Sequence, residues 1–329
     1  MQYILRRLFQ GIIICFGVSI ITFLLPHLYY KPISLAIAAN SIRTPHYILE
    51  KWVQAHGLNR PIWDQYISWL WGVFHGDFGI SLAKGTSGVP VSTMIGGNVW
   101  RSIFLTLPPT IISICLAIPL GLTQAIKRNK TWDYSTTSFI FILYSTPAAL
   151  LSILMIRYLA IQFSIGQVGI DSFAQEVSAA NFPMYMIHNS SMFLLPFAAI
   201  VFLSIGGLSR YMRGSALDTL VQDYVRTARA KGASNRRVLF RHVLRPSAIP
   251  LLTILGLSLP GIFSGALIIE SIFNFPGMGI LSVKSVQVGD FTTVMMITLL
   301  LSVFTVLGNL LADVFLVFAD PRIRLQGKR

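Results

Sequence analysis

Six stretches of apolar residues alternate with polar segments along the chain. None of the six contains Lys, Arg, Asp or Glu, and they cover Leu8–Tyr30, Ser102–Ile126, Tyr134–Ile156, Asn189–Ser209, Ser247–Ile269 and Phe291–Ala312. A helix needs roughly 20 apolar residues to cross about 30 Å of hydrocarbon. Inside a bilayer there is no water to bond the backbone, so the N–H and C=O groups of a spanning segment must form hydrogen bonds with each other. A helix forms these bonds within one segment and a single strand does not. The pattern therefore predicts an all-α fold, a polytopic membrane bundle of six transmembrane helices.

Composition supports a membrane protein and argues against a soluble one. Hydrophobic residues make up 54% of the 329 positions and charged residues 12%, and the mean hydropathy is +0.67. A soluble globular chain carries charge on about a quarter of its residues. So few charges could not cover the surface of one or two soluble domains, whereas a bilayer requires no charged cover.

The distribution of basic residues orients the bundle. Eighteen of the 26 Lys and Arg residues fall on one predicted side and seven on the other, with Arg157 at the outer end of the third span. Because basic loops stay on the cytoplasmic side, we expect both termini in the cytoplasm. The net charge of +14 is then chiefly a topology signal that adds attraction to anionic lipid. Nucleic-acid binding is the disfavoured interpretation of this charge.

The sequence carries no signature of catalytic or metal chemistry. Cys15 and Cys115 fall inside apolar stretches, where a free cysteine behaves as a small hydrophobe, and the six His residues show no metal-ligand spacing. It contains no G-x-x-x-x-G-K-[ST] phosphate loop and no nucleophile–base pair. We therefore predict no catalytic residue, metal, cofactor or ATPase site in this chain. A channel or secondary transporter is the alternative class, but the internal repeats and mid-membrane ionisable groups frequent in such proteins are not visible.

The polar segment 31–101 predicts a small external subdomain after the first span. Within it, four apolar residues recur at helical spacing behind a proline that can open a helix: Ile62, Tyr66, Leu70 and Val73 after Pro61. Tryptophans at 63, 69 and 71 suit the interface between water and lipid. Two interpretations stay open: a lid that packs on the bundle, and a surface that contacts a partner.

The segment 210–246 predicts a cationic helix–turn–helix on the cytoplasmic side. Gly232 can end the first helix in the left-handed conformation, and Ser234 or Asn235 can cap the second. The apolar residues expected on the docking faces are Tyr224 and Ala228 in the first helix and Val238, Leu239 and Val243 in the second. A short, partly apolar, cationic projection suits docking in a protein groove. A loop resting on lipid headgroups is the alternative.

Residues Asp223–Gly232 read D-Y-V-R-T-A-R-A-K-G. This run resembles the EAA loop of importer permeases in the ATP-binding-cassette superfamily, in the form typical of the oligopeptide/dipeptide branch, with Arg226-Thr227-Ala228 in place of the strict E-A-A. The long first external loop is similar to that of the B-type permease. Further matches run through most of the chain: Gly57–Pro61, Gly76–Gly79, Ser145–Pro147, Leu195–Pro196, Glu270–Gly279, Asp290–Phe291, Asn309, Asp313 and Asp320–Arg324.

The resemblance implies an inner-membrane permease that works with other subunits. These are a second, C-type permease, two cytoplasmic ATPases that bind the EAA-type loops of the two permeases, and an extracytoplasmic solute-binding protein. It implies peptides as the solute, with a nickel chelate, glutathione or a sugar as alternatives. It also divides the chain into 1–30 (N-terminus and first helix), 31–101 (external subdomain), 102–320 (permease core, including the coupling loop 210–246) and 321–329 (cytoplasmic tail).

Two sets of site residues follow from the resemblance. The ATPase-coupling set comprises Asp223, Tyr224, Arg226, Ala228, Arg229, Ala230, Lys231, Gly232, Arg236 and Arg237. The set for an external gate or docking rim comprises Glu270, Phe273, Pro276, Gly277 and Gly279.

Overall fold

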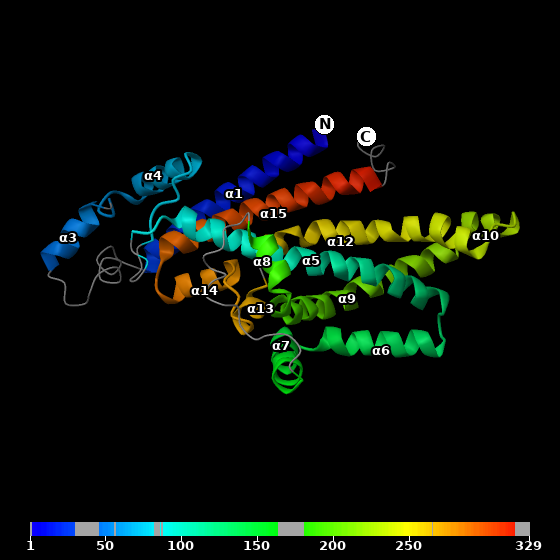
Figure 1. Ribbon diagram of the computed structural model, residues 1–329. Coiled ribbons are helices and arrows are strands. Elements are labelled where there is room, and N and C mark those ends of the chain that lie inside the picture. The colour runs from blue at the N-terminus through cyan, green and yellow to red at the C-terminus, as the bar shows by residue number, and fades with distance from the viewer. Residues whose placement is uncertain are drawn as a thin grey trace. The chain divides into compact units, whose positions relative to one another are not determined.

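The computed structural model describes residues 2–29, 46–55, 57–81, 86, 88–163, 181–264 and 266–319. The predicted tail 321–329 and residues 31–45 of the predicted external subdomain lie outside this part of the chain. Nearly all the described residues are helical, and their β pairing is limited to an isolated bridge between Ile80 and Pro90. The chain divides into two compact units. Figure 1 shows their helices coloured in chain order from blue to red.

The first unit comprises residues 1–102 and 276–307. Its helices are α1 (Gln2–Tyr29), α3 (His46–Ala55), α4 (Ile62–Phe74), the first part of α5 (Val91–Ile126), α14 (Met278–Gln287) and the first part of α15 (Phe291–Ala319). One cluster of its core joins α1, α4 and α15 through Phe23, Tyr66 and Met295. The expected helix after Pro61 is therefore present, and its inner face packs on the first membrane helix.

A buried carboxylate ties two distant segments of the first unit together. Asp290, which precedes α15, is 1% exposed. Its Oδ2 accepts hydrogen bonds from the Ser81 hydroxyl at 2.6 Å and from the Thr293 hydroxyl at 2.7 Å. Because a buried polar group is costly unless it is paired, these bonds hold the residues that follow α4 against the start of α15.

The second unit comprises residues 103–275 and the end of the chain from Gly308. Besides the remainder of α5 and α15, it contains α6 (Thr131–Ser145), α7 (Ala148–Leu154), η1 (Met155–Gln162), α8 (Phe182–His188), α9 (Ser190–Leu220), α10 (Asp223–Ala230), α11 (Asn235–Arg237), η3 (Val238–Leu244), α12 (Arg245–Ser264) and α13 (Leu267–Ile272). Its largest aromatic cluster gathers Phe182, Phe193, Phe273 and Phe275 with aliphatic residues of α5, α7 and α9.

Four described helices are long and apolar enough to cross a membrane. They are Arg6–Leu24 within α1, all of α5, all of α9, and Phe291–Asp313 within α15. These four match four of the six expected spans. A fifth candidate is a bent pair, Thr131–Ser145 followed by Ala148–Gln162. The described helices therefore confirm an all-helical membrane protein, and the count of six spans stays a prediction.

The continuous helix expected over Tyr134–Ile156 is wrong, because the chain breaks at Thr146 and Pro147 and bends by 102° there. Proline has no N–H to donate to the preceding turn, and its ring pushes the residue before it out of the helical region. Thr146 accordingly adopts an extended conformation with ψ at 128°. The stretch expected over Ser247–Ile269 is also divided, with α12 ending at Ser264 and α13 beginning at Leu267.

Candidate functional site

The loop between α9 and α12 begins with the short helix α10. Val225, in its first turn, is completely buried, whereas Tyr224, Arg226 and Arg229 are exposed. Arg226 lies 3.9 Å from Asp223, measured from Nη1 to Oδ1, and both side chains are largely in solvent. A surface pair of this kind contributes little to stability. α10 therefore has one apolar anchor and an exposed cationic face.

The turn after α10 has the geometry expected at Gly232. Gly232 has a φ of +79°, and its N–H donates to the carbonyl of Arg229 at 2.9 Å. The N–H of Ala233 donates to the carbonyl of Ala228 at 3.1 Å. These two bonds form a Schellman motif, in which a left-handed residue ends the helix and satisfies its last carbonyls. The predicted glycine stop is confirmed.

The second helix of the loop begins at Ser234, as predicted. The Ser234 hydroxyl accepts a hydrogen bond from the N–H of Arg237 at 3.4 Å, which satisfies one of the free donors at a helix start. The chain then passes through α11 and the π-helical segment η3 directly into α12, without a break at Pro246. The second loop helix is therefore continuous with the predicted fifth span.

Three valines attach the loop to the rest of the second unit. Val225, Val238 and Val243 are at most 2% exposed. They pack against the end of α5, the last third of α9 and the first turns of α12, through Leu122, Ala125, Met212, Ala216 and Leu251. Behind them, the Ser247 hydroxyl donates to Thr219 Oγ1 at 3.0 Å. A displacement of the loop must therefore displace the ends of these helices.

The predicted docking face needs a correction at Val238 and Val243. Both were expected to face a partner, yet both are buried against apolar residues of α5, α9 and α12, because this packing removes their side chains from water. The exposed apolar side chains are instead Tyr224, which was predicted, and Val221 and Phe240, which the sequence reasoning missed. Phe240 follows Val238 by two residues, so helical spacing alone put it on the opposite face.

Most of the predicted coupling residues are exposed on this loop. Among the predicted coupling residues, Arg226, Arg229, Ala230, Lys231, Gly232, Arg236 and Arg237 are exposed and Ala228 is half-buried. The structure therefore brings the predicted set together on one short projection. Its surface exposes two aromatic side chains and several basic ones, a combination that suits a protein groove with apolar and acidic residues.

Close helix packing supports the loop from behind. A Cβ placed on Gly121 of α5 would lie 2.6 Å from the carbonyl oxygen of Ser209 and 2.9 Å from the amide nitrogen of Arg213, both in α9. The two backbones can approach this closely only because position 121 has no side chain. Gly121 thus fixes the distance between the two helices that carry most of the loop's core.

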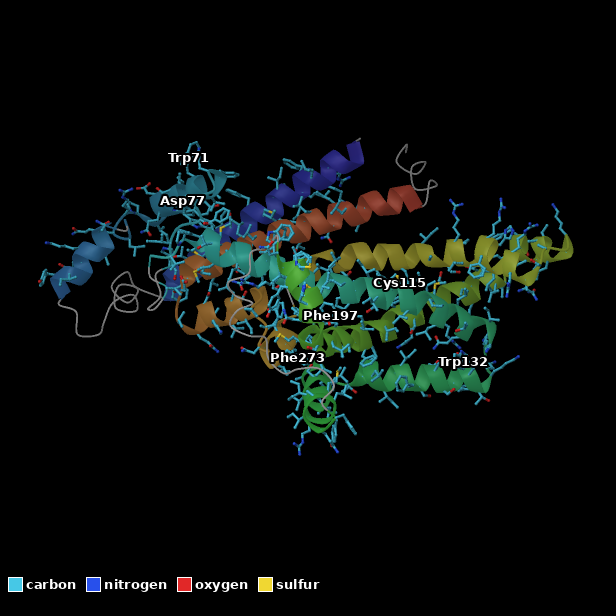
Figure 2. All side chains as sticks on the ribbon, viewed as in Figure 1. Trp71, Asp77, Cys115, Trp132, Phe197 and Phe273 are labelled. Carbon is cyan, nitrogen blue, oxygen red and sulfur yellow. The ribbon has the colours of Figure 1, made fainter. Side chains whose placement is uncertain are left out.

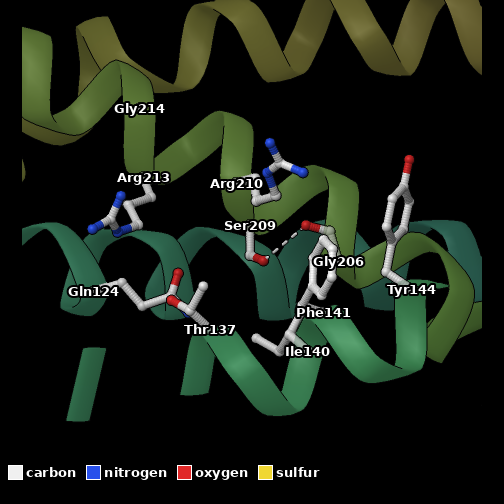
Figure 3. Close-up of a pocket in the computed structure, with 10 residues that line it drawn as sticks. All are labelled: Gln124, Thr137, Ile140, Phe141, Tyr144, Gly206, Ser209, Arg210, Arg213 and Gly214. Carbon is white, nitrogen blue, oxygen red and sulfur yellow. Dashed lines mark hydrogen bonds between the residues drawn. The ribbon is translucent and has the colours of Figure 1, made fainter. Parts of the chain in front are cut away.

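A pocket lies between α5, α6 and α9 (Figure 3). It has a volume of about 270 Å³, and its polar lining includes Gln124, Thr137, Arg210 and Arg213. At this end of α6, Arg213 donates two hydrogen bonds to the buried carboxylate of Asp133. Sequence reasoning missed this pair. The only available signal was one acid at the start of a span and one arginine at the end of another.

The residues assigned to an external gate or docking rim lie largely inside the protein. In the second unit, Glu270 and Phe273 are 0% and 1% exposed, and Phe273, labelled in Figure 2, packs in the aromatic cluster with Phe182. In the first unit, Gly277 and Gly279 are buried and Pro276 is half-buried. The burial of Glu270 and Phe273 gives no support to a docking rim. A gating role for this segment stays a prediction.

Comparison with known families gives matches over nearly the whole chain. Residues 117–325 match the family model described as binding-protein-dependent transport system inner membrane component. Residues 1–115 match the model for the N-terminal part of the same kind of membrane component. The first of these matches contains all of α9, α10, η3 and α12.

Characterised relatives align over almost their full lengths. The chain is 33% identical over 322 residues to the oligopeptide transport system permease protein AppB of Bacillus subtilis, covering 98% of each chain. It is 29% identical to the oligopeptide transport system permease protein OppB of Mycobacterium tuberculosis, covering 98% of this chain and 99% of that protein. It is 28% identical to the dipeptide transport system permease protein DppB of Escherichia coli K12, with the same coverage.

Proposed function

The chain belongs to the family of binding-protein-dependent transport system inner membrane components, and we propose that it is the permease subunit of an ATP-binding-cassette importer for peptides. It is a multi-pass membrane protein of the inner membrane. The names of its relatives, oligopeptide and dipeptide permeases over nearly the full length, support peptides as the solute. In this proposal both termini are cytoplasmic and the segment with α3 and α4 is external.

The partners follow from the family and the loop. We propose a second, C-type permease beside this chain, two cytoplasmic ATPases, and an extracytoplasmic binding protein that delivers the ligand. The observation that carries the ATPase contact is the exposed aromatic and cationic face of the loop, with Tyr224, Phe240 and the arginines on one projection. This chain has no phosphate loop, so ATP is hydrolysed by the partners.

The loop is built to pass movement to the bundle. A force on Tyr224 or Phe240 reaches Val225, Val238 and Val243 within the same short helices, and these valines are buried against α5, α9 and α12. Packed interfaces resist gradual deformation and switch between discrete arrangements. Closure of the ATPase dimer would then shift these helices together and change the access of the pathway. A ligand or partner can bias such an equilibrium only through unequal contacts with the two states.

Uptake measurements test the solute. In cells from which the gene is deleted, uptake of radiolabelled dipeptides and tetrapeptides should fall and return with the wild-type gene. Uptake of a nickel chelate, glutathione or a disaccharide, measured in parallel, should be unchanged. If the uptake of one of these other solutes were lost while peptide uptake stayed normal, the peptide proposal would be overturned and the importer proposal would remain intact.

Co-purification tests the coupling loop. Replacing Phe240, an exposed aromatic residue, by Ser should reduce recovery of the ATPases with the membrane complex at matched expression. Replacing Val238, a buried neighbour, by Ala leaves the exposed face unchanged but creates a cavity, so it should lower thermal stability first. Full ATPase recovery for Phe240→Ser would remove this face from the contact. The isolated chain should neither bind nor hydrolyse ATP.

A further inference from the structure

Helix α4 (Ile62–Phe74) has three distinct faces. The first faces inward, where Ile62, Tyr66, Trp69 and Leu70 pack in a cluster with α1. The second is an exposed stripe of large apolar side chains: Trp63, Ile67, Trp71 and Phe74, each between 59% and 79% exposed. The third is a narrow polar strip with Asp64 and Ser68, which are both exposed.

The order of these faces around the helix is informative. At 100° per residue, the stripe lies between the inward face and the polar strip. Asp64 is the only charged residue in α4. The exposed surface is therefore divided into an apolar half and a polar half, which is the pattern of a helix lying in the plane of a membrane interface.

Contacts with α1 fix the depth of α4. The Tyr66 hydroxyl lies 2.8 Å from the Ser19 hydroxyl, and its ring is 5.4 Å from the ring of Phe23. Trp69 is 5.6 Å from Phe23, measured between ring centroids. Ser19 and Phe23 belong to the membrane-span candidate Arg6–Leu24. α4 therefore lies alongside the last turns of a membrane helix, not above its end.

The membrane-span candidate in α1, on which α4 packs, also carries exposed apolar side chains. Phe16 and Ile21 of α1 are 52% and 60% exposed and lie within the membrane-span candidate. Phe16 contacts Tyr66 edge to face at 6.4 Å. A soluble partner would have to reach below the membrane surface to cover the stripe, whereas acyl chains are present at this depth. Tryptophan rings are enriched at this level of the bilayer.

We propose that α4 is an interfacial helix whose stripe of Trp63, Ile67, Trp71 and Phe74 is inserted into the lipid leaflet at the C-terminal end of α1. Asp64 and Ser68 face the water above it. The helix then anchors the external subdomain to the membrane at a fixed depth. The polar turn after the helix agrees with this placement, because the exposed His75 and Asp77 follow the stripe. The His75 ring lies 4.5 Å from the Trp71 ring, measured between centroids, and Figure 2 labels Trp71 and Asp77. This inference does not depend on which solute the importer carries.

Spin-label accessibility tests the placement. Single cysteines are introduced as Trp63→Cys and Ile67→Cys on the stripe, with Asp64→Cys and Ser68→Cys as matched controls on the polar strip of the same helix. Cys15 and Cys115 are first replaced by alanine. The full-length chain, with the subunits that co-purify with it, is reconstituted in vesicles of phosphatidylethanolamine and phosphatidylglycerol. Collision rates of each label are measured with oxygen, which concentrates in lipid, and with a water-soluble nickel chelate.

Labels at 63 and 67 should collide more often with oxygen than with the nickel chelate, and labels at 64 and 68 should show the reverse order. Preferential collision of all four labels with the nickel chelate would place α4 in water and overturn the proposal. Low collision rates with both reagents at 63 and 67 would show that protein covers the stripe, which would overturn it equally. The proposal predicts that labels on neighbouring residues of one helix differ in their preference for oxygen or the nickel chelate. A globally misfolded chain would not produce this difference between positions 63 and 64 or between 67 and 68.

Discussion

Arg213 forms a bidentate ion pair with the carboxylate of Asp133. Its Nε donates to Oδ1 at 3.0 Å and its Nη2 donates to Oδ2 at 2.8 Å. The Asp133 side chain is 3% exposed and the Arg213 side chain 30%. Asp133 also accepts a hydrogen bond from the N–H of Asn129 at 3.1 Å, where the chain turns into α6 with a positive φ. The bidentate ion pair therefore links the first turn of α6 to helix α9.

The first prediction concerns this pair. Arg213→Ala removes the cation from a buried carboxylate, and breaking a buried pair costs about 3 kcal/mol. The thermal midpoint of the detergent-solubilised chain should therefore fall clearly. Arg210→Ala is the control, because Arg210 is an exposed arginine on the same helix. Equal midpoints for the two variants would contradict the prediction. Asp133→Asn combined with Arg213→Gln should recover part of the loss, since no unpaired charge is then left buried.

A second prediction concerns the turn at Gly232. A Cβ added there would meet no atom within 4 Å, but φ is +79°, so the cost of Gly232→Ala is backbone strain of about 1 kcal/mol. Gly232→Val should cost more, because β-branched residues fit this region poorly. We expect normal membrane insertion with reduced ATPase recovery or uncoupled hydrolysis.

The matched control for this turn is Gly214→Ala. Gly214 lies inside α9 and a Cβ there also meets nothing within 4 Å, so alanine should be neutral or slightly stabilising. Charge reversals at Arg229 and Lys231 help to distinguish a loop that docks on the ATPases from a loop that rests on lipid headgroups. If the loop rests on anionic lipid, those reversals should impair uptake and Gly232→Val should be silent.

A third prediction concerns the contact between α5 and α9. Gly121→Ala places a methyl group 2.6 Å from both the Ser209 carbonyl oxygen and Met212 Cβ, so one helix must move. Overpacking of this kind costs about 1–3 kcal/mol, and the yield of monodisperse protein and its thermal midpoint should fall. Gly96→Ala in the same helix meets nothing within 4 Å and should behave as wild type. A wild-type midpoint for Gly121→Ala would show that α5 and α9 are not so close.

A fourth prediction concerns orientation. In a chain with Cys15 and Cys115 replaced, Asn59→Cys and Asn235→Cys each place a thiol at an exposed position. A membrane-impermeant maleimide added to intact cells should label position 59 and not position 235, and permeabilised cells should show both. Labelling of 235 in intact cells would reverse the topology inferred from the basic residues.

Local structure could be predicted wherever one residue type decides it. The stop at Gly232 and the cap at Ser234 were predicted because a positive φ and a free helix N–H each have few chemical solutions. The break at Pro147 was missed, although proline favours it. Prolines 108, 109 and 119 remain inside the continuous helix α5, so proline alone does not decide between a kink and a 102° bend.

The helical, membrane-embedded character of the chain could be predicted from sequence, because the length and hydropathy of each segment indicate whether it transfers into lipid. The sequence also indicated the family through a contiguous motif, and the coupling role of the loop that carries this motif stays a prediction. The three-dimensional packing was needed to show that Val225 and Val238 anchor the loop while Phe240 is exposed. It was also needed to show that Tyr66 faces α1 while Trp71 faces outward. The physical reason is that lipid is as apolar as a protein interior. Hydrophobicity therefore identifies which segments leave water, but it cannot distinguish the side chains that pack on protein from those that face lipid.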